Sequence, residues 1–190
     1  MHLLIGLGNL GTQYAATRHN FGFLLLDQII EDYRLISVGK KFSSEVFSGE
    51  ISGHKVIALK PQTYMNNSGL AALAAMQFYK ITPENIIVFH DEIDLAFGKI
   101  KVKFAGGSAG HNGLKSLDEN IGKDYWRLRL GVGRPENKEF EVADYVLSKF
   151  SSTEITEVET INKKISPLLP LLLANKSELF VNDFSLELKK

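Results

Sequence analysis

Residues 2–11 read HLLIGLGNLG, an apolar run that leads into a glycine-rich turn. The apolar run predicts a buried β-strand at residues 2–7. The glycines that follow have the G-x-G-x-x-G spacing of dinucleotide-binding folds, in which a pyrophosphate closely approaches a helix N-terminus. This stretch predicts the start of an α/β fold and raises the question of whether the protein binds a dinucleotide.

The segments that follow argue against a dinucleotide site. Apolar residues at helical spacing predict a helix over residues 21–33, but residues 12–20 separate it from the glycines, whereas the fingerprint opens a helix at its last glycine. Residues 41–60, KFSSEVFSGEISGHKVIALK, predict an antiparallel hairpin with its turn near Ser52–Gly53. A dinucleotide fold needs a parallel strand there. We therefore predict no NAD site.

A second helix is predicted over residues 67–79. Asn67 and Ser68 can cap its N-terminus, and the helix runs to Tyr79. Four residues at helical spacing are predicted to form its inner face: Leu70, Leu73, Ala74 and Phe78.

The remaining segments complete the pattern of an α/β fold. Strands are predicted within residues 85–94, 98–107 and 126–133, and a short helix over residues 111–122. From Phe140 onward the chain is predicted to be mostly helical, with interruptions at Ser166–Pro167 and Pro170. The elements predict a single α/β domain over residues 1–190, with a mixed, twisted β-sheet flanked by helices.

Composition limits the chemistry and the compartment. The 190-residue chain has no cysteine, which excludes disulfides, thiolate metal sites and a cysteine nucleophile. Its N-terminus begins with the strand pattern and lacks the features of a signal peptide, and Pro170 breaks the apolar run at residues 168–174. No heptad repeat is visible. We expect a soluble, cytoplasmic monomer with no membrane contact.

The formal net charge is zero, but the charges are unevenly distributed. Residues 99–134 contain eight basic and three acidic residues, a local net charge of +5. Taken alone, this segment favours a solvated surface with a lysine-guarded strand edge. A contact with nucleic acid is the alternative.

Residues 106–110, GGSAG, match the G-x-S-x-G nucleophile elbow of serine hydrolases. In those enzymes an acid and then a histidine follow the serine along the chain. The only histidine after Ser108 is His111, and no aspartate lies between them. We predict that Ser108 is a loop residue and not a nucleophile.

Polar residues follow several predicted strands, where ligand sites of open α/β sheets form. His19, Asp91 and Asn112 occupy such positions. A histidine can take a proton from water, and an aspartate bonded to its other nitrogen fixes the tautomer and stabilises the imidazolium. With no nucleophile at hand, this pair predicts direct attack by water.

A metal site is the alternative at the end of the strand within residues 85–94. Its candidate ligands, which suit Mg²⁺ or Mn²⁺, are His90, Asp91, Glu92 and Asp94. Because neighbouring residues at one strand end point in different directions, we rank this site below the His–Asp pair.

Asparagines cluster in the same loops at five positions: Asn9, Asn20, Asn66, Asn67 and Asn112. An amide both donates and accepts hydrogen bonds, so it suits a peptide bond, a ribose hydroxyl or a polarised carbonyl. Asparagine also favours turns and helix caps, and we expect this structural role for Asn20 and Asn67.

Several segments, in this order, closely resemble the bacterial-type peptidyl-tRNA hydrolase family. They are GLGNLGTQYAATRHNFG, KPQTYMNNSG, FHDEIDLAFGKIKVKFAGGSAGHNGLKS and WRLRLGVGRP, and the resemblance extends through VADYVLSKF to about Leu147. It implies a phosphorylase/hydrolase-like α/β fold and hydrolysis of the ester between peptide and tRNA, which recycles tRNA released prematurely from ribosomes. It implies no cofactor and no metal.

The resemblance also implies roles for matching residues. It makes His19 the catalytic base, Asp91 its partner and Asn9 a further catalytic residue. The implied substrate-binding residues are Tyr14, Met65, Asn66, His111 and Asn112. Lys103 and Arg129 match basic residues that hold the 5′-phosphate of tRNA, so the +5 segment becomes an expected RNA contact.

The sequence departs from the family pattern at a few positions. Leu10 stands where a proline is usual, Ala105 and Ala109 replace glycines, and residues 96–97 replace a proline-containing stretch. None of these positions carries a group assigned to chemistry.

Two other functions fit part of the sequence. One is an inactive RNA-binding protein on the same fold, similar to plant organellar splicing-factor relatives, which would show a transit peptide or an added hydrophobic surface; the sequence shows neither. The other is a small esterase or carboxypeptidase, which would lose activity on Ser108→Ala substitution or with a chelator.

Overall fold

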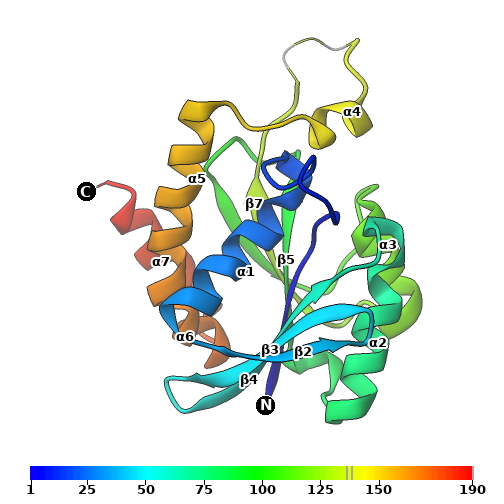
Figure 1. The fold of residues 1–190 in the computed structure, drawn as a ribbon. Helices are drawn as coiled ribbons and strands as arrows, with labels where there is room; N and C mark the ends of the chain where they lie inside the picture. The colour runs from blue at the N-terminus through cyan, green and yellow to red at the C-terminus, as the bar shows by residue number, and fades with distance from the viewer. Residues whose placement is uncertain (136, 138, 190) are drawn as a thin grey trace.

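The computed structural model describes residues 1–135, 137 and 139–189 (Figure 1). Its strands are β1 (His2–Gly6), β2 (Ile36–Lys41), β3 (Ser44–Ile51), β4 (His54–Pro61), β5 (Ile86–Glu92), β6 (Ile100–Phe104) and β7 (Trp126–Gly131). Its α-helices are α1 (Phe21–Asp32), α2 (Ser68–Tyr79), α3 (Asn112–Ile121), α4 (Val142–Leu147), α5 (Ser152–Ile165), α6 (Leu169–Leu173) and α7 (Ser177–Glu187). Short 3₁₀ helices are η1 (Arg18–Asn20), η2 (Met65–Asn67), η3 (Pro83–Asn85) and η4 (Ser166–Leu168).

The strands form one mixed sheet in the order β2-β3-β4-β1-β5-β7-β6. Strands β4, β1, β5 and β7 are parallel, so their carboxyl ends meet at one edge. β3 pairs antiparallel with β4 across the predicted turn at Ser52–Gly53, and β6 pairs antiparallel with β7. The predicted mixed α/β sheet is confirmed, and its parallel centre brings the loops after β1 and β5 side by side.

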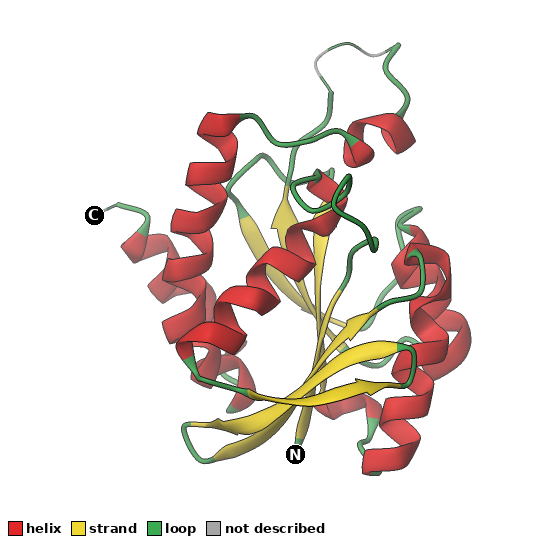
Figure 2. Cartoon of the chain, viewed as in Figure 1, coloured by secondary structure: helices red, strands yellow, loops and turns green. Residues whose placement is uncertain are grey.

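Helices cover both faces of the sheet (Figure 2). On one face, α1 packs with α5, α6 and α7 over a core that includes Leu4 and Phe89. On the other face, α2 and α3 pack over a core that includes Ile5 and Val88. Successive residues of β1 and β5 therefore point into different cores, the pattern of strands buried on both faces.

The predicted inner face of α2 is wrong. Leu70 and Phe78 are 58% and 62% exposed, whereas the small residues Ala71, Ala72 and Ala75 are buried. A Cβ atom at Gly69 would collide with the backbone oxygen of Ser116 in α3. Because α2 and α3 approach so closely, small residues form the contact, and Leu70 and Phe78 point outward.

The C-terminal region is helical, as predicted, and its prolines lie where helices begin. Pro167 lies in η4 and Pro170 in the first turn of α6, where a backbone N–H has no partner within the helix. In the described part of the chain, no helix combines the length and apolarity that a membrane span requires.

Candidate active site

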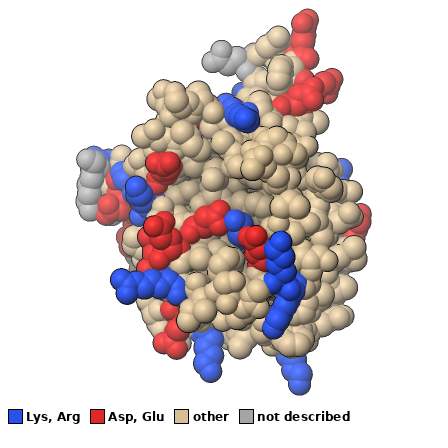
Figure 3. All heavy atoms as spheres, viewed as in Figure 1, with Lys and Arg blue, Asp and Glu red and all other residues tan. Residues whose placement is uncertain are grey.

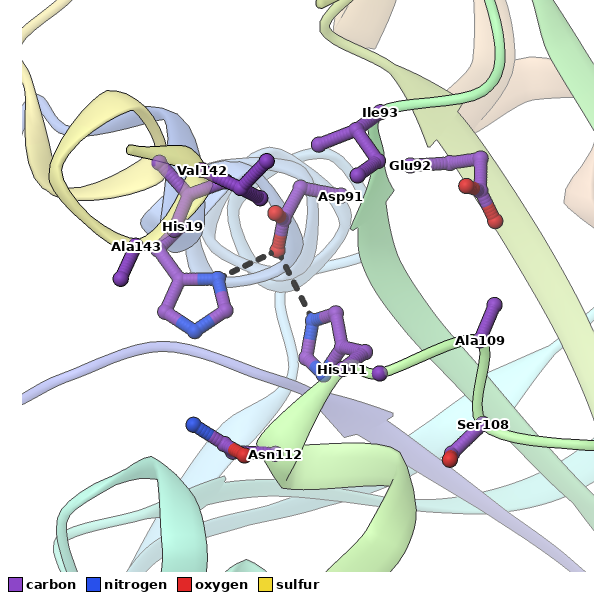
Figure 4. Close-up of a pocket in the computed structure, with 12 residues that line it drawn as sticks. His19, Asp91, Glu92, Ile93, Ser108, Ala109, His111, Asn112, Val142 and Ala143 are labelled. Atoms are coloured by element: carbon purple, nitrogen blue, oxygen red, sulfur yellow. Dashed lines mark hydrogen bonds and ion pairs between the residues drawn. The ribbon is translucent and has the colours of Figure 1, made fainter. Parts of the chain in front are cut away.

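Three of the polar residues that the sequence singles out meet at the carboxyl edge of the sheet (Figure 4). His19 lies in η1, after the loop that follows β1, Asp91 is near the end of β5, and His111 directly precedes α3. They line a cavity of about 280 Å³, together with Ile93 and residues of α4. Their meeting depends on β1 and β5 being neighbouring parallel strands.

The two histidines contact the same carboxylate oxygen. Nδ1 of His19 lies 2.9 Å from Oδ1 of Asp91, and Nε2 of His111 lies 3.0 Å from it. The Asp91 side chain is 2% exposed. Burial disfavours its charged form, but the charges of His19 and His111 and the hydrogen bonds from both rings lower the pKa of Asp91 well below its ordinary value. Asp91 is therefore ionised and both rings donate to it.

The N-terminus of α3 determines the tautomer of His111. Nδ1 of this ring accepts the backbone N–H groups of Gly113 and Leu114, at 3.1 and 3.3 Å, and so caps the helix. A nitrogen that accepts hydrogen bonds carries no hydrogen, so in the neutral ring the hydrogen is on Nε2 and is donated to Asp91. Both nitrogens of His111 are thus occupied.

His19 keeps one nitrogen available for chemistry. Its Nδ1 donates to Asp91, and none of the hydrogen bonds among the described residues uses its Nε2. In Figure 4 this second nitrogen points away from Asp91, toward the side on which Asn112 lies. Burial alone lowers the pKa of His19, but the charge of Asp91 and its hydrogen bond outweigh burial and raise that pKa above its ordinary value.

By residue type, His19, Asp91 and His111 could also hold a metal ion, since one ligand atom of each lies within 4.8 Å of the others. A histidine nitrogen binds a metal through its lone pair, which requires that it carry no hydrogen. In His111, metal binding at Nε2 would move the hydrogen to Nδ1, against the two backbone N–H groups that it caps. The hydrogen bonds therefore favour a His–Asp pair over a metal centre.

The alternative metal ligands at the end of β5 are not brought together. Asp91 faces the histidines, Glu92 accepts from Arg129, and Asp94 pairs with Arg134. Nδ1 of His90 donates a hydrogen bond to the backbone oxygen of Asp91, at 2.7 Å. Burial, and after it the charge of His111, lower the pKa of the His90 ring to about 3, so the ring is neutral.

Asparagines hold the glycine-rich loop beside His19. The N–H of Asn9 donates to Oδ1 of Asn20 at 2.8 Å, and Nδ2 of Asn20 donates to the carbonyl oxygen of Asn9 at 2.9 Å. Oδ1 of Asn9 accepts the N–H of Met65 at 2.9 Å. Asn20 occupies the N-cap position of α1 and has a structural role, as predicted, but its side chain makes no capping hydrogen bond and positions Asn9 instead.

The other predicted substrate-binding residues have different surroundings. Met65 is 4% exposed and packs in the core beneath α2 and α3. Asn66 and Asn112 are exposed, and Asn112 lines the cavity beside His19. Tyr14 is half-buried in the loop after β1. Asn67 occupies the N-cap position of α2, where its side chain makes no capping bond.

A second cavity, of about 120 Å³, lies on the β6 and β7 side and is lined by Lys103, Arg129 and His90 among others. Nε of Arg129 donates to Glu92 at 2.9 Å, whereas Lys103 forms no ion pair within the described residues. Glu92 also lines the His19 cavity, so the two cavities share this residue. They also share Ser108, which is a loop residue, as predicted.

Two arginines have structural contacts that the sequence does not reveal. Arg127, part of the +5 segment, is 2% exposed and donates to the carbonyl oxygens of Gly106 and Gly107 and to Asp118. Arg18 donates to Ser148, Lys149 and Glu154 and so ties the start of α5 to the turn that carries His19. Both arginines lie in segments that resemble the family, but the sequence does not reveal their contacts, because these join segments that are distant along the chain.

The fold and the site together define an α/β enzyme with a histidine–aspartate pair at the carboxyl edge of its sheet. A family model described as peptidyl-tRNA hydrolase matches residues 3–190. The peptidyl-tRNA hydrolase of Azorhizobium caulinodans is 49% identical over 182 residues, 96% of this chain and 89% of that protein. That of Rickettsia bellii strain RML369-C is 50% identical over 181 residues, 95% of this chain and 97% of that protein.

A solved structure agrees with these relatives. The crystal structure of peptidyl-tRNA hydrolase from Acinetobacter baumannii superposes with a TM-score of 0.90 at 38% identity and covers 97% of this chain and 94% of that one. The chain belongs to the peptidyl-tRNA hydrolase family, which confirms the resemblance found in the sequence.

Proposed function

We propose that this protein hydrolyses peptidyl-tRNA, cleaving the ester between the peptide carboxyl group and the ribose of the terminal adenosine, and so recycles tRNA released prematurely from ribosomes. Family membership supports the reaction. The observation that carries the mechanism is the His19–Asp91 hydrogen bond of 2.9 Å, which leaves Nε2 of His19 free beside a cavity.

His19 acts as the general base. Its Nε2 takes a proton from a water molecule as the water oxygen attacks the ester carbonyl, and Asp91 stabilises the imidazolium. The tetrahedral intermediate then collapses, the bond from carbon to ribose oxygen breaks, and His19 returns the proton to that oxygen. An ester has an adequate leaving group, so neither a metal nor a covalent intermediate is needed.

Amide side chains bind the peptide. Because Oδ1 of Asn9 accepts from Met65, the Nδ2 of Asn9 is the group left to donate to a substrate carbonyl. Asn66 and Asn112 are exposed near this point and supply further amides. A peptide bond matches these groups, whereas the free α-amino group of an aminoacyl ester does not, and this difference discriminates between the two substrates.

Lys103 and Arg129 hold the 5′-phosphate of tRNA in the second cavity. Lys103 offers a charge that no carboxylate neutralises within the described residues, and Arg129 exchanges part of its contact with Glu92 for the phosphate. We further propose that the protein acts in the cytoplasm, as a monomer and without a metal cofactor.

The test is release of labelled product from N-acetyl-aminoacyl-tRNA by wild type and by His19→Ala, with EDTA and with unblocked aminoacyl-tRNA as controls. We expect rapid release that resists EDTA, requires His19 and spares the unblocked ester. Tight tRNA binding without release would favour the inactive RNA-binding protein. Loss of activity with EDTA or in Ser108→Ala would favour the esterase alternatives.

A further inference from the structure

A third cavity, of about 270 Å³, lies beside the His19 site, and of the residues that line it the mechanism above uses Asn9 alone. It lies between the loop after β1, helix α1 and the ends of β3 and β4. We call it the lateral cavity. Six of the residues that line it carry the argument: Asn9, Asn20, Phe23, Asp27, Glu45 and Lys60.

The sheet register places the lateral cavity on the same face as Asp91. Glu45 lies directly opposite Lys60 on β3 and β4, so the two side chains share a face. Ile5 of β1 pairs with Leu59 of β4 on one side and with Val88 of β5 on the other. Lys60 is therefore level with Phe89, and both side chains lie on the α1 face of the sheet. Asp91 lies on this face too, because it is two residues beyond Phe89. The cavity is therefore a lateral extension of the catalytic face.

The separation corresponds to a short peptide. β4 and β5 are separated by β1 alone, which gives roughly 10 Å at the usual strand spacing. Lys60 is level with Phe89, two residues before Asp91, so the distance between the backbones of Lys60 and Asp91 is roughly 12 Å. An extended peptide covers about 3.3 Å per residue, so three to four residues reach Lys60 and its ion-pair partner Asp27, and about five reach Glu45, which lies one strand further out.

The charges of the lateral cavity differ from those of the second cavity, which Lys103 and Arg129 line. Lys60 bonds Asp27 at 2.5 Å and lies over the ring of Phe23, whereas Glu45 forms no ion pair within the described residues. Lys40 lies opposite Glu45 on β2 but does not line the cavity. Two acids and one base thus line the cavity, and this balance repels RNA phosphates and attracts a cation.

The molecular surface agrees with this placement. On the face shown in Figure 3, acidic and basic side chains gather below a hollow near the middle of the molecule. Asn9, whose Nδ2 is available to a peptide carbonyl, lines the lateral cavity, and His19 is the residue next to Asn20. A chain that leaves the ester can therefore pass Asn9 and enter the cavity.

We propose that the lateral cavity binds the peptide upstream of the ester, and that Glu45 and Asp27 bind the N-terminal ammonium group of a peptide about four to five residues long. This inference rests on the proposed function. In this proposal the two ends of the substrate lie in surroundings of opposite charge. The RNA lies beside Lys103 and Arg129 on the β6 and β7 side, and the peptide lies beside Asp27 and Glu45 on the α1 side.

The experiment compares kcat/KM for three substrates on one tRNA: N-acetyl-aminoacyl-tRNA, tetrapeptidyl-tRNA with a free N-terminus, and the same tetrapeptidyl-tRNA after N-acetylation. For wild type we expect kcat/KM for the free tetrapeptide to exceed that for the acetylated one by about two- to fivefold, mainly through KM, the range of a partly exposed ion pair. Glu45→Gln and Asp27→Asn should each reduce this ratio.

Glu50→Gln is the matched control, because Glu50 lies on the same strand at its exposed far end, opposite Lys55. It should keep the wild-type ratio. A wild-type ratio near one, or an equal loss on all three substrates in Glu45→Gln and Asp27→Asn, would overturn the proposal and point to an RNA contact instead. Failure of wild type to hydrolyse N-acetyl-aminoacyl-tRNA would overturn the proposed function itself, a separate result.

Discussion

His19 and His111 donate to the same oxygen of Asp91, at 2.9 and 3.0 Å, but their other ring nitrogens differ. Nδ1 of His111 accepts two backbone N–H groups at the start of α3, whereas no hydrogen bond among the described residues uses Nε2 of His19, which lies beside the cavity. In the proposed mechanism this difference separates the base, His19, from a positioning residue, His111.

Asp91→Asn should change the pH profile in a defined direction. The charge of Asp91 raises the pKa of His19, so the acidic limb of kcat/KM for wild type lies above pH 6.5. Without that charge, burial alone remains and lowers the pKa, so the limb moves to lower pH. The plateau should fall by about 10³-fold, since the imidazolium loses its partner. The measurement is kcat/KM from pH 5 to 9.

Asp94→Asn is the matched control, because Asp94 is half-exposed in the turn that follows β5, the strand of Asp91, and pairs with Arg134 at the surface. It should change the rate by less than about twofold. If the limb of Asp91→Asn stays in place or moves to higher pH, Asp91 does not set the pKa of the base.

His111→Ala and His111→Asn should differ in stability. Ala removes the helix cap and one donor to Asp91, which should lower the free energy of unfolding by about 1–3 kcal/mol. Asn is a good N-cap residue and should recover part of this loss. Both variants should keep an acidic limb due to His19, measured by pH–rate profiles beside denaturant unfolding. A loss of activity as deep as that of His19→Ala, at intact stability, would make His111 the base.

The sequence allowed most elements to be predicted, because the buried strands and α1 have clear apolar patterns. It did not reveal β2, since Ile36–Lys41 is largely exposed, contains Gly39 and pairs irregularly at the sheet edge. It assigned the wrong face to α2, because the close contact at Gly69 reverses the usual preference for burying large residues.

The site could be predicted as a set of residues but not as a geometry. Strand ends indicate that His19 and Asp91 lie near each other. The sequence does not show that His111 shares the oxygen of Asp91, because the two residues are 20 positions apart in the chain. Nor does it show that Arg129 binds Glu92, which lies 37 positions away. Asn20 shows the same limit, since a residue typical of caps is used to hold Asn9.

His90→Gln should reduce the loss of unfolding free energy that accompanies a fall in pH from 7 to 4. The pKa of His90 is about 3 in the folded protein and about 6.5 in the unfolded chain, so the unfolded state binds more protons between these values. This residue therefore contributes stability above pH 6.5 that is lost as the pH falls, at up to about 1.4 kcal/mol per pH unit. Denaturant unfolding of both proteins from pH 7 to 4 measures the slope. Equal slopes would show that His90 is not held neutral.

Ala105→Gly and Ala109→Gly should stabilise the protein. Both alanines have a left-handed backbone conformation, with φ of 58° and 48°, which favours glycine. Relief of about 1–2 kcal/mol of backbone strain exceeds the added entropy of unfolded glycine, so each substitution should raise the free energy of unfolding by about 0.5–1 kcal/mol. Ala74→Gly in the interior of α2 is the control and should lower it by about 1 kcal/mol. Destabilisation by all three would mean that the loop is not strained.

Lys103→Ala should weaken binding of RNA that carries a 5′-phosphate. Lys103 lines the second cavity and forms no ion pair within the described residues, so its removal deletes a full charge from the phosphate site. We expect affinity for a 5′-phosphorylated acceptor-stem RNA to fall about tenfold, and the slope of log K against log salt to decrease by about one.

Lys101→Ala is the matched control, since Lys101 is exposed on the same strand and faces the same side but does not line the cavity. Its removal should have a smaller effect on affinity. RNA without the 5′-phosphate should bind wild type and Lys103→Ala equally, because the contact that distinguishes them is then missing. If Lys103→Ala weakened both RNAs to the same extent, Lys103 would contact the RNA elsewhere, and the second cavity would not be the phosphate site.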